Sequence, residues 1–187
     1  MRIAFFTSFQ SGWLNAWILT LCLLLIQFVY MLIYREGGKR AVDTSWYTLK
    51  DKCNASFSTF FQVAVIIISF FTPLKLGTAW FFIGCILFGI AMVGFMASFY
   101  AYAATPKSET VTHGIYRLSR NPMYFFFDVG MLAACVASAS LWLLLVTFPF
   151  IIVTHWVILG EERYCEKTYG NPYLTYKAKT PRYFLLG

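Results

Sequence analysis

The chain has 187 residues, of which 59% are hydrophobic and only 12% are charged, and its formal net charge is +7. Soluble domains carry about 25% charged residues, so this composition excludes an ordinary water-soluble fold and indicates a membrane protein. The positive charge does not predict a nucleic-acid partner, because basic residues of membrane proteins set topology and contact anionic lipid headgroups.

Five apolar segments predict an all-α polytopic membrane helix bundle, because about 20 apolar residues are needed to cross the bilayer as a helix. In chain order they cover residues 13–34, 57–72, 78–102, 122–138 and 141–160. Only Ser138, Ala139 and Ser140 separate the last two segments, which predicts a tight helical hairpin inside the bilayer. The alternative is four spans, with 122–160 forming one long bent helix.

The placement of basic residues distinguishes between these two topologies. With five spans, Arg2 and Lys75 lie on one side of the membrane and the other thirteen lysines and arginines lie on the opposite side. Basic residues accumulate on the cytoplasmic side, so five spans are favoured, with the N-terminus outside and the C-terminus in the cytoplasm. We expect one integral-membrane domain over 1–187, with three spans in 1–102 and the polar motifs, hairpin and tail in 103–187.

The first polar cluster is HGIYRLSRNPMY, residues 113–124. Asn121-Pro122 is typical of a helix start, since Asn caps helices and Pro fits the first helical position. A helix N-terminus beside Arg117 and Arg120 suits a carboxylate or phosphate. Gly114 allows a sharp turn or a close approach of the backbone to a ligand. The alternative is a belt of Tyr, Arg and His at the level of the lipid headgroups.

The second polar cluster follows the fifth span and ends at Phe184. Glu161 and Glu162 are expected at the C-terminal end of a helix, where the dipole disfavours acids, so a bound cation or a nearby arginine should compensate. The alternative is a solvated helix end. An amphipathic segment on the membrane surface is predicted from Tyr169, Tyr173 and Tyr176. Arg182 could instead bind a substrate anion bidentately, through two of its guanidinium nitrogens.

Two further polar residues fall inside the predicted spans. Asp128 is expected to face the bundle interior, and either to pair with Arg120 or Arg117 or to contact a polar substrate group. His155 is expected either to line a cavity or to hydrogen-bond between helices. The chain has only two histidines, and its five cysteines lack metal-ligand spacing, so no metal site is expected.

Taken together, the two clusters, their order and their spacing resemble a family of integral-membrane methyltransferases. The family includes the isoprenylcysteine carboxyl methyltransferases and the phospholipid methyltransferases. The resemblance covers about residues 105–184, and the first three spans carry no signature. The matching residues are Gly114, Tyr116, Arg117, Arg120, Pro122, Tyr124, Glu161, Glu162, Gly170, Tyr173 and Tyr176. Two positions depart from the pattern: Asn121 stands where many members have His, and Phe125-Phe126 replace a small Gly and could narrow the pocket.

The resemblance implies S-adenosylmethionine as cofactor, bound in the cytoplasmic tail region, and a lipophilic acceptor that enters from the membrane. The acceptor could be a prenylcysteine carboxylate, a phospholipid amine or a similar molecule. The expected cofactor-binding residues are His113, Gly114, Tyr116, Arg120, Pro122, Tyr124, Glu161 and Glu162. Arg182 and Tyr176 are expected to orient the acceptor, and Asn121 occupies a catalytic position without a titratable group.

Two other functions remain open at the level of sequence. One is a membrane NADPH-dependent reductase of the sterol-reductase type, whose C-terminal region carries a similar Arg-His-x-x-Tyr element. The other is a non-enzymatic membrane subunit whose polar loops only contact partners. The expected partners are a lipid substrate and membrane lipids, while the acceptor and the oligomeric state stay open.

Overall fold

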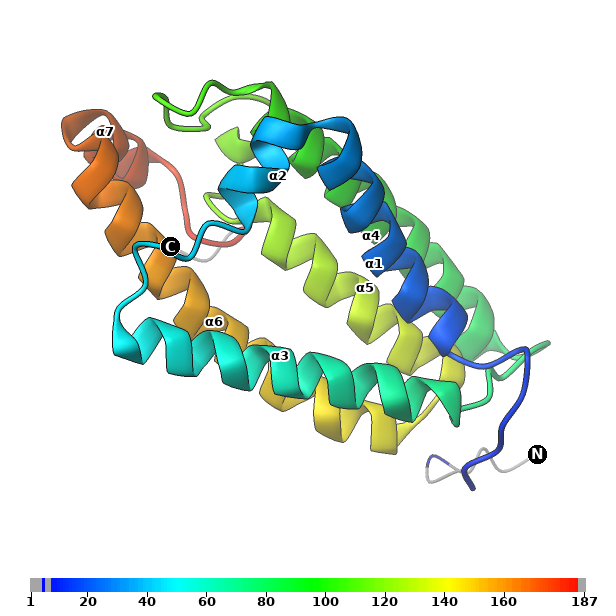
Figure 1. Ribbon diagram of the computed structural model, residues 1–187. Helices are drawn as coiled ribbons and strands as arrows, with labels where there is room; N and C mark the ends of the chain where they lie inside the picture. Colours follow the sequence, from blue (N-terminus) through cyan, green and yellow to red (C-terminus); the bar gives the residue numbers. More distant parts are fainter. Residues whose placement is uncertain (1–4, 6–7, 185–187) are drawn as a thin grey trace.

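The computed structural model describes residue 5 and residues 8–184, which form a helical bundle (Figure 1). Within this described part of the chain there are seven α-helices and a 3-10 turn, η1, at Gly114–Arg117. The helices are α1 (Trp17–Ile33), α2 (Arg35–Ala41), α3 (Leu49–Phe70), α4 (Ala79–Ala104), α5 (Pro122–Ser138), α6 (Leu141–Tyr169) and α7 (Asn171–Lys179). The all-α prediction is confirmed.

The five predicted spans correspond to α1, α3, α4, α5 and α6. Among the described residues, α3, α4 and α6 are long and apolar enough to cross a membrane, and α1 and α5 are shorter apolar helices of 17 residues. At 1.5 Å per residue, 17 residues reach about 26 Å. Large apolar side chains such as Phe60, Ile86 and Leu145 are exposed on the outside of the bundle, as expected where lipid replaces water.

Helices α4 and α5 lie along each other, and so do α3 and α6, with α1 contacting α3, α4 and α5 (Figure 1). The predicted turn between α5 and α6 is tight: Ala139 adopts a left-handed conformation (φ 46°), and the Ser140 hydroxyl accepts a hydrogen bond from the Leu143 amide. From this turn the two helices diverge and pack mainly on their other partners, α4 and α3. The hairpin is therefore open at the end that carries the polar motifs.

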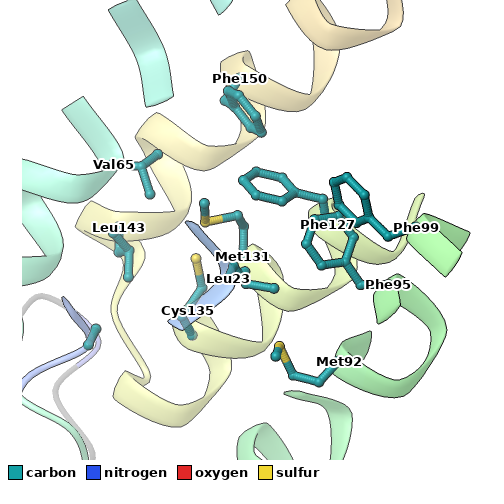
Figure 2. Close-up of a cluster of buried hydrophobic side chains, with 12 residues drawn as sticks. Leu23, Val65, Met92, Phe95, Phe99, Phe127, Met131, Cys135, Leu143 and Phe150 are labelled. Atoms are coloured by element: carbon teal, nitrogen blue, oxygen red, sulfur yellow. The ribbon is translucent and has the colours of Figure 1, made fainter. Parts of the chain in front are cut away.

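The interior of the bundle changes character along its length (Figure 2). Near the α5–α6 turn the core is made of aliphatic and sulfur side chains such as Leu23, Met131 and Leu143, all at most 1% exposed. Farther from the turn it becomes aromatic, and the labelled rings of Phe95, Phe99, Phe127 and Phe150 gather there. Phe95 meets Phe99 edge to face at 4.9 Å and Phe127 at 5.6 Å.

Small residues allow α4 and α5 to pack closely. A Cβ atom added to Gly84 would lie 2.5 Å from the Ala137 nitrogen, whereas one added to Gly89 would meet nothing within 4 Å. We expect Gly84→Ala to destabilise the protein by about 1–3 kcal/mol, because backbone rather than a flexible side chain blocks the new methyl group. Thermal unfolding in detergent measures this effect. Gly89→Ala, on the same helix, is the matched control; equal unfolding temperatures for the two variants would contradict the close packing.

The largest differences from the sequence expectation are two helix boundaries and one additional helix, because apolar length alone set the predicted ends. α3 starts at Leu49 rather than 57, since Thr48 and Asp51 form a capping box before the apolar stretch. α6 continues to Tyr169, nine residues beyond the predicted end, because Glu, Arg and Lys are good helix formers once outside the membrane. The first loop contains the short helix α2, which was not predicted.

Candidate active site

Two cavities that share a wall lie where the polar motifs meet. The smaller, of about 100 Å³, lies between η1, α4, α5, α6 and α7. The larger, of about 290 Å³, extends into the bundle and is lined there by Phe95, Phe99, Phe127 and Phe150. Six residues line both cavities: Tyr102, Met123, Tyr124, Glu161, Cys165 and Tyr169.

Glu162 binds three polar residues that come from two other parts of the chain. Its side chain is 4% exposed. The Arg182 Nε and Nη2 atoms donate to its two oxygens at 3.1 and 3.0 Å, and the Arg120 Nε donates at 3.2 Å. The amide Nδ2 of Asn121 adds a hydrogen bond of 2.9 Å. The hydrogen bonds to Glu162 raise the pKa of Arg182, so this cluster stays ionised.

Arg120 also fixes the C-terminal segment against the start of α5. Its Nη1 donates to the carbonyl of Lys177 at 3.0 Å and to that of Thr180, which satisfies carbonyls at the C-terminal end of α7. Its backbone amide donates to the Pro181 carbonyl at 2.9 Å, and the Ser119 hydroxyl donates to the Arg182 carbonyl at 2.9 Å. These hydrogen bonds hold the tail against the start of α5, so that Tyr173 and Tyr176 of α7 line the smaller cavity.

Glu161 points in a different direction from Glu162, because neighbouring residues of a helix are about 100° apart. The Tyr124 hydroxyl donates a 2.6 Å hydrogen bond to its Oε1. Glu161 is thus held by α5 at the wall between the two cavities. Both glutamates lie inside α6, about two turns before its end, so the expectation that they sit at a helix C-terminus was wrong.

The three tail tyrosines contribute to this site rather than to a membrane-surface segment. Tyr169, Tyr173 and Tyr176 all line the smaller cavity, and the last two are buried. The Tyr176 hydroxyl donates to the Tyr116 carbonyl at 2.7 Å. Burial raises the pKa of Tyr176, so its hydroxyl stays protonated.

Most residues predicted from the sequence come together around the smaller cavity. Those that line it are Tyr116, Arg120, Asn121, Tyr124, Glu161, Glu162 and Tyr176. Pro122 is buried at the start of α5 and positions that helix, while Arg182 contacts the cavity only through Glu162. His113 and Gly114 are exposed at the start of η1, and Gly114, its first residue, adopts a left-handed conformation (φ 59°).

Three expectations about the protein contacts of residues in or beside the spans were not met, while contact of Asp128 with a polar substrate group stays a prediction. Asp128 Oδ1 is buried without a hydrogen-bond partner among the described residues, and the predicted pair with Arg120 is absent because Arg120 binds Glu162 and tail carbonyls. His155 Nδ1 instead contacts the Tyr183 hydroxyl of the tail at 2.7 Å. Phe125 packs at a tilt and Phe126 edge to face against Phe184, and neither lines either cavity.

Several lining residues were missed at the level of sequence because they lie outside both motifs. Asp43, Trp46 and Tyr47 come from the loop before α3 and line the larger cavity. Trp46 stacks on Tyr164 of α6 with ring centroids 4.5 Å apart. Thr110, before η1, lines the smaller cavity, and its hydroxyl has no hydrogen-bond partner among the described residues. In the sequence, only the adjacent aromatic residues Trp46 and Tyr47, just before the Thr48 cap, could have indicated that this loop contributes to a site.

An all-helical membrane bundle with two adjoining cavities, lined by aromatic side chains and a small number of placed polar groups, has the architecture of a ligand-binding membrane protein. The chain matches the family described as Phospholipid methyltransferase over residues 74–172, which is more than half of its length. It therefore belongs to this family, part of the group of membrane methyltransferases related to the isoprenylcysteine carboxyl methyltransferases. Neither a curated protein nor a solved structure matches the chain. The family match includes α4, so the expectation that the third span carries no signature was wrong.

Proposed function

We propose that the protein transfers a methyl group from S-adenosylmethionine to an amine of a lipid-like acceptor. The observation that carries this proposal is the shared wall between a polar cavity and a deeper aromatic cavity, with Glu161 and Tyr124 in it. A wall common to two cavities brings the reacting ends of two ligands together, and such positioning supplies much of the rate in group transfer.

The smaller cavity has the residues that this cofactor needs. Arg120 and Glu162 offer a cation and an anion for the carboxylate and ammonium of the amino-acid end. The rings of Tyr116, Tyr173 and Tyr176 offer faces for adenosine, and the Thr110 hydroxyl, which has no partner in the described part of the chain, offers a hydrogen bond. When bound, the cofactor supplies an electrophilic methyl group on a sulfonium, which is a good leaving group.

The larger cavity favours an amine over a carboxylate as the acceptor. The two lining residues that carry carboxyl groups are Asp43 and Glu161, and the other lining residues are neutral and largely aromatic. Hydrogen bonds from Ser45 lower the pKa of Asp43, so this carboxylate stays ionised at neutral pH. Aromatic faces and carboxylates attract an ammonium group and repel a carboxylate. A prenylcysteine carboxylate fits this lining less well.

Glu161 is the residue that we assign to proton transfer. An ammonium has no lone pair, so the acceptor must lose a proton before its nitrogen forms the new N–C bond as the methyl C–S bond breaks. Glu161 accepts this proton at Oε1 or Oε2, while the Tyr124 hydroxyl holds the carboxyl group in place. Asn121 then needs no titratable group, because its amide supports Glu162.

The orientation in the membrane follows from the same proposal. The polar cavity, α7 and most basic residues lie at one end of the bundle, which we place on the cytoplasmic side according to the positive-inside rule. The segments 1–102 and 103–187 then supply equal shares of the residues that line the acceptor cavity, and 103–187 supplies most of the cofactor cavity, within one membrane domain.

Calorimetric titration of the purified protein with S-adenosylhomocysteine tests the cofactor assignment. We expect saturable binding at micromolar ligand, and no binding of NADPH at the same concentration. Arg120, Arg182 and Lys177 near the smaller cavity each pair with Glu162 or Glu166, so the described residues build no dense cluster of unpaired basic side chains there for the 2′-phosphate of NADPH. Preferential binding of NADPH would instead support a reductase.

A further inference from the structure

The larger cavity contains polar groups well below the level of the reacting atoms. Gln27 of α1 and Gln62 of α3 line it, together with Ser58 of α3 and Thr154 of α6. All four residues belong to helices assigned as membrane spans. Polar side chains inside a membrane are costly, and those that line a cavity are functional candidates by default.

The two glutamines are not used to hold the bundle together. Among the described residues, no hydrogen bond joins either side-chain amide to another side chain or to the backbone. This differs from the outer end of the bundle, where Asn15 Nδ2 donates to the carbonyls of Gln10 and Phe70, both at 2.6 Å, and fixes α1 to α3. An amide that lines a cavity without a protein partner can give its hydrogen bonds to a ligand in that cavity.

The depth of this polar layer can be measured along the helices. Thr154 precedes Glu161 by seven residues on α6, which is about 10 Å along the helix axis. The Ser58 and Thr154 hydroxyls are 3.2 Å apart, which places Ser58 at the same depth. Gln62 lies one turn farther along α3, about 6 Å beyond Ser58. The rings of Phe127 and Phe150 line the cavity beside this layer.

We propose that Gln27 and Gln62, with the Ser58–Thr154 hydroxyl pair, form a hydrogen-bonding subsite for a carbonyl oxygen of the acceptor. The subsite selects molecules that carry an ester or amide carbonyl about 10–16 Å from the methylated nitrogen, and it disfavours those with only hydrocarbon there. Two amides present four N–H donors, so carbonyl acceptors fit this layer. This inference rests on the acceptor occupying the larger cavity, as proposed above.

A matched pair of lipids tests the subsite: a diacyl phosphatidylethanolamine and its dialkyl ether analogue with equal chain length. Affinity is measured by native mass spectrometry and, separately, kcat/KM by transfer of labelled methyl groups. We expect the wild-type protein to prefer the diacyl lipid about tenfold in both measurements, and Gln27→Leu plus Gln62→Leu to reduce this preference to twofold or less. Leucine suits a membrane interior, so the variant keeps its fold.

Two controls make the result specific. Gln10→Leu replaces an exposed glutamine outside both cavities and is expected to keep the wild-type preference. Affinity for S-adenosylhomocysteine is expected to stay unchanged in all variants, because the glutamines do not line the smaller cavity.

The two readouts separate failure of the subsite from failure of the proposed function. Equal affinity of the wild-type protein for both lipids, or a preference that survives both substitutions, overturns the subsite even if methyl transfer occurs. A diacyl preference that depends on the glutamines but is not accompanied by methyl transfer confirms the subsite and overturns the proposed function.

Discussion

Glu161→Gln is expected to lower kcat for methyl transfer at least a hundredfold while changing the affinity for S-adenosylhomocysteine less than threefold. General base catalysis contributes about 10²–10⁴-fold to a rate, and glutamine keeps the shape of the side chain but cannot take the proton. The Tyr124 hydroxyl can still donate to the glutamine carbonyl oxygen, so the wall between the cavities is expected to keep its geometry.

The control for this variant is Glu166→Gln, which removes a carboxylate from the same helix. Glu166 pairs with Lys177 and lines neither cavity. Its loss is expected to change kcat less than twofold. Retained activity in Glu161→Gln would overturn the assigned base and would favour a carboxylate acceptor, which needs no deprotonation.

Glu162→Gln is expected to weaken S-adenosylhomocysteine binding at least tenfold and to destabilise the protein by about 3 kcal/mol. Removing one partner of a buried ion pair leaves the other charge uncompensated, which costs about 3–5 kcal/mol. The Arg120 side chain is only 7% exposed and would lose its charged partner, whereas Arg182 at 26% can be solvated more easily.

The physical reason for the binding loss is the position of the tail. Glu162 connects Arg120, at the start of α5, with Arg182, beyond the end of α7. Without its charge, the segment that covers the smaller cavity loses its main anchor. Thermal unfolding, calorimetry and limited proteolysis of the tail measure the three consequences.

The same Glu166→Gln variant serves here as the comparison for a half-exposed ion pair, since pairs that water reaches contribute about 0–1 kcal/mol. A Glu162→Gln protein with wild-type unfolding temperature, tail protection and cofactor affinity would show that the cluster neither anchors the tail nor supports the cofactor.

The site could be predicted in part because its residues lie in two ordered motifs. Arg120, Tyr124, Glu161 and Glu162 were all selected from the sequence, and all line one cavity. Their individual roles could not be predicted. Arg120 was assigned only to a cofactor carboxylate, and the structure adds a second role, because its guanidinium nitrogens donate to Glu162 and to tail carbonyls. Such pairings depend on how far α6 continues, and apolar length does not determine that.

The sequence by itself determined the class of the protein and its helices. The low charge content, the five apolar segments and the asymmetric distribution of basic residues are properties of composition or of local sequence. They can therefore be recognised without knowing which residues contact one another in the fold. Only the tertiary structure decided which side chains face each cavity and which side chains contact one another. It separated Glu161 from Glu162, and brought Asp43, Trp46 and Tyr47 from the first loop to the larger cavity. It also placed Gln27 and Gln62, which are far apart in the chain, on the wall of that cavity. Lipid and the protein interior are equally apolar, so packing rather than hydrophobicity decides which side of a membrane helix faces its neighbours.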